Sequence, residues 1–131
     1  MRRSQGGSQP RMPWAVLIFS ALVVLSLWFM LAPPRFWINI IKRVDLSEPV
    51  RTGEVLLNRY GCRNCHQVGG YGGFIAPSLD GVTTRLSEDE LRAWLRDPEA
   101  VQGPTAMPDF SLSDSEIEAI LAYFADNDSV R

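Results

Sequence analysis

The chain contains very little histidine, cysteine or lysine. Its 131 residues include one histidine, two cysteines and a single lysine, Lys42. Because Cys62 and Cys65 are only three positions apart, they exclude a miniprotein built on a disulfide framework. The part of the chain after residue 44 has no dense cluster of lysine and arginine, which argues against binding to nucleic acid.

Charge is divided unevenly along the chain. Residues 1–44 carry six cations and no carboxylate, whereas residues 45–131 carry seven arginines and fifteen carboxylates, a formal charge of −8. We therefore expect one small domain preceded by a separate basic segment. The acidic body would dock on a basic partner surface at a rate that falls as salt rises, unless its charge serves solubility alone.

The basic segment contains a long uncharged run. Residues 14–32 read WAVLIFSALVVLSLWFMLA, and as a helix this run is about 28 Å long, close to the thickness of the bilayer hydrocarbon. We predict a transmembrane anchor over residues 14–32 behind a tail of residues 1–13. A cleaved signal peptide shares the pattern, but the length of the run, the lack of an A-x-A sequence and the proline pair that follows favour retention.

Residues 33–48 follow that proline pair. Apolar residues recur there at helical spacing, at Phe36, Trp37, Ile40 and Ile41. The segment is either a short amphipathic helix, lying on the membrane or against a partner subunit, or an extended linker.

Residues 49–128 are predicted to form a small all-α domain. A helix is expected over residues 50–60, and two more begin at capping boxes, Ser87 with Glu90 and Ser113 with Glu116. Asp97-Pro98 is expected to end the second helix. The glycine-rich residues 69–81 show no alternation typical of a strand and are predicted as a loop. A domain of this size buries little apolar surface, so we expect a cofactor in its core.

The chemistry is concentrated in the pentapeptide Cys62-Arg63-Asn64-Cys65-His66. C-x-x-C-H is typical of covalent attachment of haem c. Two thiols on one helical turn can reach the two vinyl groups of a porphyrin edge, and His66 then binds the iron. Two alternatives are weaker: a zinc site would need a carboxylate as its fourth ligand, and a thioredoxin-like dithiol would need a βαβ setting.

The second axial ligand follows by elimination. After His66 no histidine remains, and Lys42 lies close to the predicted membrane anchor. Of the four methionines only Met107 lies in the acidic body, within a loop rich in glycine and proline. Methionine is also a common core filler, but this setting predicts Met107 as the axial ligand of a His/Met site, as in electron carriers.

These motifs together resemble the class I cytochromes c. The resemblance covers residues 50–126, and its motifs come in the family's order: Cys62–His66, Ala76-Pro77-Ser78-Leu79, Trp94 with Asp97-Pro98, and Met107-Pro108-Asp109-Phe110. It implies an all-α fold in which the helix containing Gly53 and Leu57 crosses the last helix near Leu121 and Phe124.

The resemblance also implies roles for four residues around the haem. The carbonyl of Pro77 would accept the Nδ1 proton of His66, which fixes the ring. Leu79 and Phe110 would pack on the haem. Trp94 would donate its indole N–H to a haem propionate, or it would simply pack in the core.

The implied function is one-electron transfer by a single, covalently bound haem c. Iron ligated on both faces has no open position for substrate, so the chain is expected to be an electron carrier, or a subunit of a respiratory or photosynthetic complex, and not an enzyme by itself. Covalent haem attachment takes place outside the cytoplasm, which would put residues 33–131 outside the inner membrane and residues 1–13 in the cytoplasm.

The expected partners are the lipid bilayer and membrane redox proteins, with no small-molecule substrate. The body lacks the lysine ring by which mitochondrial-type carriers dock, so docking would use acidic or apolar surface. Two alternatives stay open: the haem c subunit of a nitric oxide reductase-like complex, and a haem enzyme from which Met107 dissociates.

Overall fold

A computed structural model describes residues 13–31 and 33–130, which fall into two compact units that divide after Pro34. The predicted tail, apart from Pro13, and Ala32 at the end of the predicted anchor lie outside the described residues. Each unit is described by itself.

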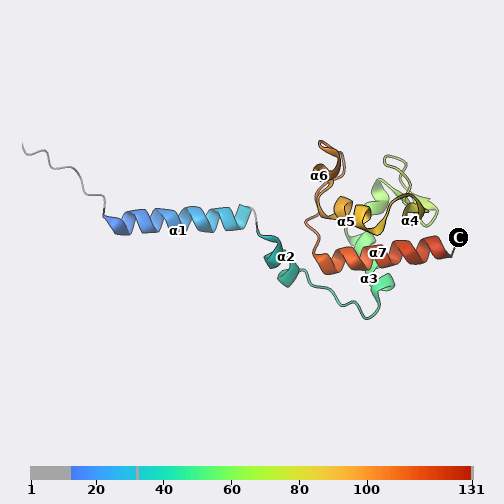
Figure 1. Ribbon diagram of the computed structural model, residues 1–131, viewed down its shortest axis with the longest axis horizontal. Helices are drawn as coiled ribbons and strands as arrows, with labels where there is room; N and C mark the ends of the chain where they lie inside the picture. Colours follow the sequence, from blue (N-terminus) through green and yellow to red (C-terminus); the bar gives the residue numbers. More distant parts are fainter. Residues whose placement is uncertain (1–12, 32, 131) are drawn as a thin grey trace, which may run out of the picture. The chain divides into compact units, whose positions relative to one another are not determined.

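The first unit contains one helix, α1 (Trp14–Leu31), drawn in blue in Figure 1. None of its residues is buried within the protein. The Ser20 hydroxyl donates a hydrogen bond to the Leu17 carbonyl 3.0 Å away, so its donor has a partner within the helix. In the described part of the chain, α1 is the one helix long and apolar enough to cross a membrane.

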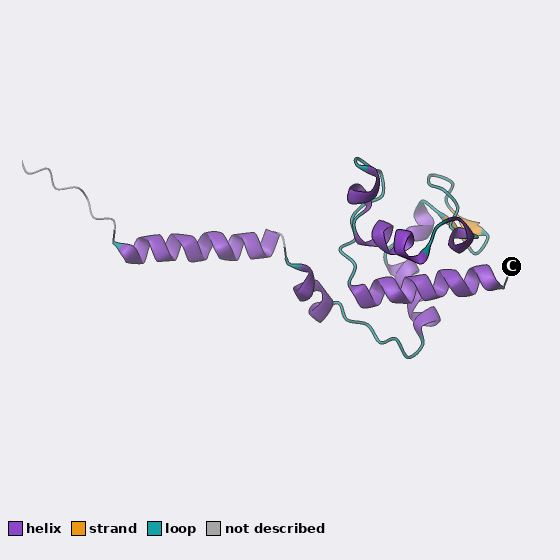
Figure 2. Ribbon diagram, viewed as in Figure 1, coloured by secondary structure: helices purple, strands orange, loops and turns teal. Residues whose placement is uncertain are grey.

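The second unit is built from helices, as Figure 2 shows, and this confirms the predicted all-α class. Six α-helices and one 3-10 turn are present in its described residues: α2 (Arg35–Ile41), α3 (Pro49–Arg59), η1 (Cys62–Asn64), α4 (Val82–Arg85), α5 (Glu88–Arg96), α6 (Pro98–Gln102) and α7 (Asp114–Ser129). Both predicted capping boxes are present at the starts of α5 and α7.

The helices α3 and α7 cross closely at Gly53. A Cβ atom built on Gly53 would lie 2.1 Å from the Ala119 carbonyl oxygen and 2.8 Å from the Tyr123 Cβ. Leu57, Leu121 and the other buried apolar residues of these helices form the core around this crossing. The crossing that the family resemblance implied is therefore confirmed, with Ala119 and Tyr123 as the closest neighbours of Gly53.

One local prediction was wrong in part. Residues 69–81, predicted as a loop, include the strand β2 (Tyr71–Gly72), which pairs antiparallel with β1 (Gln67–Val68) just before them. Two glycines with φ of +73° and +81° form the turn between the strands, a conformation that a strand pattern cannot reveal. The prediction that Asp97-Pro98 ends a helix is confirmed, because α5 ends at Arg96. The same pair also begins the next helix, since Pro98 is the first residue of α6 and the Asp97 carboxylate accepts from the Ala100 N–H at 3.0 Å.

The sequence left a helix and a linker open for residues 33–48, of which residues 35–48 belong to the second compact unit. Residues 35–41 form α2, and residues 43–46 continue without regular structure to α3.

Candidate functional site

The two cysteines lie on and just after the turn η1, as their spacing predicts. Gly61 precedes the turn with a φ of +67°, a left-handed conformation that favours glycine. The His66 N–H then donates to the Cys62 carbonyl at 3.0 Å. Cys65 is exposed, whereas Cys62 is partly buried against the core, and burial raises the pKa of its thiol. The structure thus brings two unpaired thiols onto one turn, directly before His66.

The imidazole of His66 is oriented by the Pro77 carbonyl. Nδ1 of His66 lies 2.7 Å from that oxygen, so the hydrogen bond that the family resemblance implied is present. A carbonyl oxygen can only accept, which requires the proton on Nδ1. In the neutral ring Nε2 is then left with a free electron pair, and this is the tautomer that a metal-binding histidine needs.

The loop after β2 is held tightly against the motif. The N–H groups of Ile75 and Ala76 both donate to the Cys65 carbonyl, at 3.1 and 2.9 Å, and the Gly73 N–H donates to the Arg63 carbonyl at 2.8 Å. At Gly73 a Cβ atom would lie 2.3 Å from the Asn64 carbonyl oxygen. Only glycine permits this approach, so the backbone of the loop fixes the motif.

The same loop leaves apolar side chains uncovered. Phe74 is 83% exposed and Ile75 is 80% exposed. They are the two residues before Ala76, whose N–H donates to the Cys65 carbonyl. An apolar group bound at the motif, or an apolar partner surface, would remove such side chains from water.

Leu79, Phe110 and Cys62 are all partly buried and pack against the core cluster of the domain. The ring of Phe110 lies 5.5 Å from the ring of Tyr60. The Tyr60 hydroxyl donates to the buried Glu116 carboxylate at 2.8 Å. Burial and this hydrogen bond raise the pKa of Tyr60 to about 12, so the tyrosine stays neutral and fixes the side of the core against which Phe110 packs.

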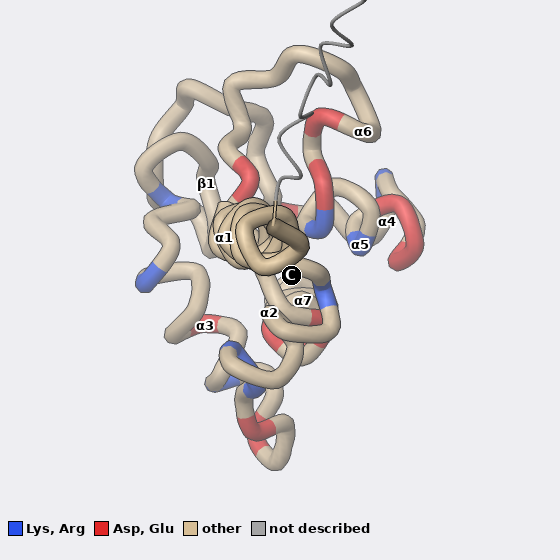
Figure 3. Tube along the Cα trace, turned by 90° about the vertical axis from the view of Figure 1, so that its left-hand side faces the viewer, with Lys and Arg blue, Asp and Glu red and all other residues tan. Residues whose placement is uncertain are grey.

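Met107 and Trp94 are both partly buried, Met107 in the connection between α6 and α7 and Trp94 in α5. In the described part of the chain, no hydrogen bond or ring contact joins either side chain to the motif. In Figure 1 the yellow-green glycine loop and the orange segment around α6 rise on the same side of α7. Figure 3, turned by 90°, also places β1 and α6 above α7. The role of Met107 as a ligand stays a prediction.

Sequence reasoning missed two residues that support the site. Arg63 donates to the Tyr123 hydroxyl at 2.8 Å and stacks 4.5 Å from the centroid of the Tyr71 ring. The Asp80 carboxylate accepts from the Gly69 and Gly70 N–H groups, at 2.7 and 3.0 Å. Arg63 occupies a variable position inside C-x-x-C-H, so the motif carries no signal for it.

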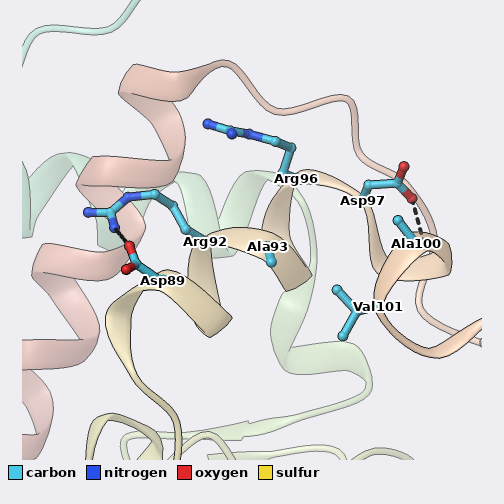
Figure 4. Close-up of a pocket in the computed structure, with 7 residues that line it drawn as sticks. All are labelled: Asp89, Arg92, Ala93, Arg96, Asp97, Ala100 and Val101. Atoms are coloured by element: carbon cyan, nitrogen blue, oxygen red, sulfur yellow. Dashed lines mark hydrogen bonds and ion pairs between the residues drawn. The ribbon is translucent and has the colours of Figure 1, made fainter.

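A separate hollow of about 380 Å³ lies along α5 and α6, as Figure 4 shows, and none of the predicted site residues lines it. Its Arg92 pairs with Asp89 at 2.8 Å and with Glu118 at 2.7 Å. Arg96, the other arginine that lines the hollow, pairs with Asp114 at 2.9 Å. Both arginines of the hollow are therefore already paired with carboxylates.

The donor set fits haem better than zinc. No three histidine, cysteine, aspartate or glutamate side chains among residues 13–31 and 33–130 are placed to share a metal ion, and this range includes every cysteine and histidine of the chain. Two thiols and an imidazole with its Nε2 available suit a cofactor that is held covalently at one edge and ligated at its metal.

The part of the chain that carries the site matches a known protein family. The family described as cytochrome c oxidase, cbb3-type, subunit III matches residues 48–124, a range that includes the motif, the glycine loop and Met107.

Individual relatives are similar over different lengths. The nitric oxide reductase C subunit of Halomonas halodenitrificans is 29% identical over 126 residues, covering 87% of this chain and 78% of that protein. The nitric oxide reductase C subunit of Paracoccus denitrificans is 28% identical over 114 residues, covering 80% and 72%. Cytochrome c oxidase subunit 2 of Alkalihalophilus pseudofirmus is 28% identical over 92 residues, covering 60% of this chain but only 27% of that protein.

Proposed function

The chain belongs to the family described as cytochrome c oxidase, cbb3-type, subunit III, and from this premise we propose that it passes single electrons through one covalently bound haem c. It is a membrane-anchored cytochrome c. The observation that carries the proposal is the 2.7 Å contact between His66 Nδ1 and the Pro77 carbonyl beside two unpaired thiols.

In this proposal Cys62 and Cys65 would hold the haem through thioethers, and His66 and Met107 would ligate its iron. When bound, haem iron with a nitrogen and a thioether ligand supplies a one-electron couple of raised potential. The Pro77 carbonyl keeps the imidazole in one orientation and makes it more basic. Leu79 and Phe110 exclude water from the site, and Trp94 either donates to a propionate or packs beside it.

The acidic body and the exposed loop define how a partner would dock. Acidic positions occur on several elements, among them α3, α6 and α7 (Figure 3). The exposed Phe74 and Ile75 lie next to the motif and supply an apolar contact at that place. We therefore expect a partner surface that is apolar at its centre and basic at its rim, with transfer that slows as salt rises.

The proposed topology puts residues 14–32 across the inner membrane, residues 33–131 outside it and residues 1–13 in the cytoplasm. The chain would then act as a carrier or subunit of a membrane redox complex. Protease added to spheroplasts would remove the body and leave α1 protected. Protection of the body in spheroplasts would contradict this topology.

A nitric oxide reductase-like complex is a second candidate for the assembly. The supporting observation is that the similarity to the reductase protein of Halomonas halodenitrificans extends over 87% of the chain, more than the 60% matched by the oxidase protein. Purification in mild detergent separates the candidates. A catalytic subunit with its own metals would co-purify in a reductase-like complex, and a lone carrier would migrate by itself.

The test of the haem proposal is the mass and spectrum of the full chain produced in a host that attaches haem c. The mass should exceed that of the bare polypeptide by one haem, and Cys62→Ser with Cys65→Ser should remove this increment. A bare mass without Soret absorbance, or zinc in place of iron, would refute the proposal. Rapid cyanide binding by the oxidised protein would instead favour a haem enzyme from which Met107 dissociates.

A further inference from the structure

Helix α2 has two opposite faces. At 100° per residue, Arg35, Asn39 and Lys42 lie on one side of the helix, and each contacts the rest of the second unit. The apolar residues project from the other side, where the exposed fractions are Phe36 58%, Trp37 43%, Ile40 66% and Ile41 65%.

The polar face is fixed to the start of α7 by a single carboxylate. Arg35 donates to one oxygen of Asp114 at 2.9 Å, and the Asn39 amide donates to the other at 2.7 Å. The side-chain Oδ1 of Asn39 in turn accepts from the backbone N–H of Asp114 at 2.9 Å. Both carboxylate oxygens are used, which fixes the rotation of α2 about its own axis.

The end of α2 is attached to the segment that follows Met107. The Lys42 ammonium donates to the carbonyls of Phe110 and Ser111, at 3.2 and 3.0 Å, and the Ser113 hydroxyl donates to the Lys42 carbonyl at 2.9 Å. This segment includes Ser111, whose φ of +49° is unusual for a residue other than glycine. Residues 35–44 are therefore a bound part of the domain and not a free linker.

The exposed face lies close in sequence to the membrane anchor. Only residues 32–34 separate α1 from α2, and four chain steps reach at most about 14 Å. If α1 spans the bilayer, α2 begins within that distance of its end. Amphipathic helices at this depth bury an apolar face in the boundary between headgroups and acyl chains, where tryptophan and basic residues are enriched.

We propose that Phe36, Trp37, Ile40 and Ile41 lie in the lipid interface of the membrane that anchors the chain, so that α2 holds the cytochrome domain in a fixed orientation on the membrane surface. The inference rests on the proposed membrane span and is independent of the haem.

The test uses the full chain in liposomes and two photoreactive diazirines, one dissolved in the lipid and one in water. Trypsin releases α2 as a peptide of residues 36–42. The matched control is the peptide of residues 52–59 from α3, which carries a Val55 that is 51% exposed. We expect the lipid reagent to label residues 36–42 several-fold more than residues 52–59, and the water reagent to show the opposite preference.

Equal lipid labelling of the two peptides, with residues 36–42 open to the water reagent, would overturn the inference and assign the face to a protein partner. The peptide of residues 12–35 reports the span in the same sample. If that peptide also lacks lipid label, the span and the inference fail together. Soret absorbance, measured separately, tells whether the haem proposal stands in either case.

Discussion

The crossing of α3 and α7 predicts how a larger residue at Gly53 changes the stability of this helix pair, where helix propensity and packing act in opposite directions. Replacing Gly53 by alanine would put a Cβ atom 2.1 Å from the Ala119 carbonyl oxygen, whereas real Cβ atoms essentially never approach within 3.0 Å. Helix α3 would have to retreat by about 1 Å, and the obstacle is backbone, which cannot rotate away.

Two effects of this substitution oppose each other. Alanine in a helix interior is favoured over glycine by about 1 kcal/mol. Overpacking a tight core costs about 1–3 kcal/mol, and a rigid backbone neighbour places the cost at the upper end. We therefore expect a net loss of about 2 kcal/mol in the stability of the α3–α7 pair, equivalent to a fall of roughly 30-fold in amide protection.

Hydrogen–deuterium exchange of α3 and α7 in the detergent-solubilised full chain measures this loss. Glu54→Ala is the matched control, because Glu54 is the next residue in α3 and is exposed, so alanine there adds helix propensity without a new contact. The reasoning is refuted if Gly53→Ala keeps or gains protection in the way that Glu54→Ala does.

Three further predictions concern the site and α2. Met107→Ala should lower the reduction potential and abolish the long-wavelength band that the cytochrome c resemblance attributes to iron–thioether bonding, whereas Met30→Ala in α1 should leave both unchanged. Gly73→Ala should reduce haem content, because its Cβ would lie 2.3 Å from the Asn64 carbonyl oxygen, and an unchanged haem content would contradict the role given to this loop. The hydrogen bond from Arg35 holds the pKa of Asp114 below its ordinary value of 3.8. Since the folded-state pKa is the lower one, its stabilising contribution is complete above pH 3.8 and is lost as pH falls through the folded-state value. Exchange in α2, corrected for intrinsic rates, should therefore accelerate below pH 3.8, and exchange that is independent of pH there would contradict the role given to Asp114.

Much of the fold is readable from the sequence because its signals are local. The capping boxes at Ser87 and Ser113 mark the true starts of α5 and α7, since a serine with a glutamate three positions on satisfies two backbone donors wherever it occurs. The C-x-x-C-H spacing likewise places two thiols on one turn before the histidine.

The missed features depend on partners that are distant in sequence. The ladder of β1 and β2 is too short to alternate, and its turn is held by Asp80, ten or more positions away. Helix α4 is also short, and its start is held by the Asp128 carboxylate, which accepts from the Gly81 and Thr83 N–H groups at 2.7 and 2.9 Å. Hydrogen bonds of this kind between a side chain and the backbone leave no hydrophobic period in the sequence, so periodicity cannot predict them.

Helix α2 bears directly on whether the chain is a mobile carrier or a fixed subunit. A flexible tether would raise the effective concentration of the domain for any membrane partner within its reach. Here residues 35–44 are instead attached to the domain through Asp114, Phe110 and Ser111, and only three residues connect α2 to α1. If α2 also lies in the lipid interface, as proposed, the domain would keep one orientation on the membrane. In that case Phe74 and Ile75, which are exposed, would be presented at one height, an arrangement that suits a neighbouring subunit better than a freely diffusing acceptor.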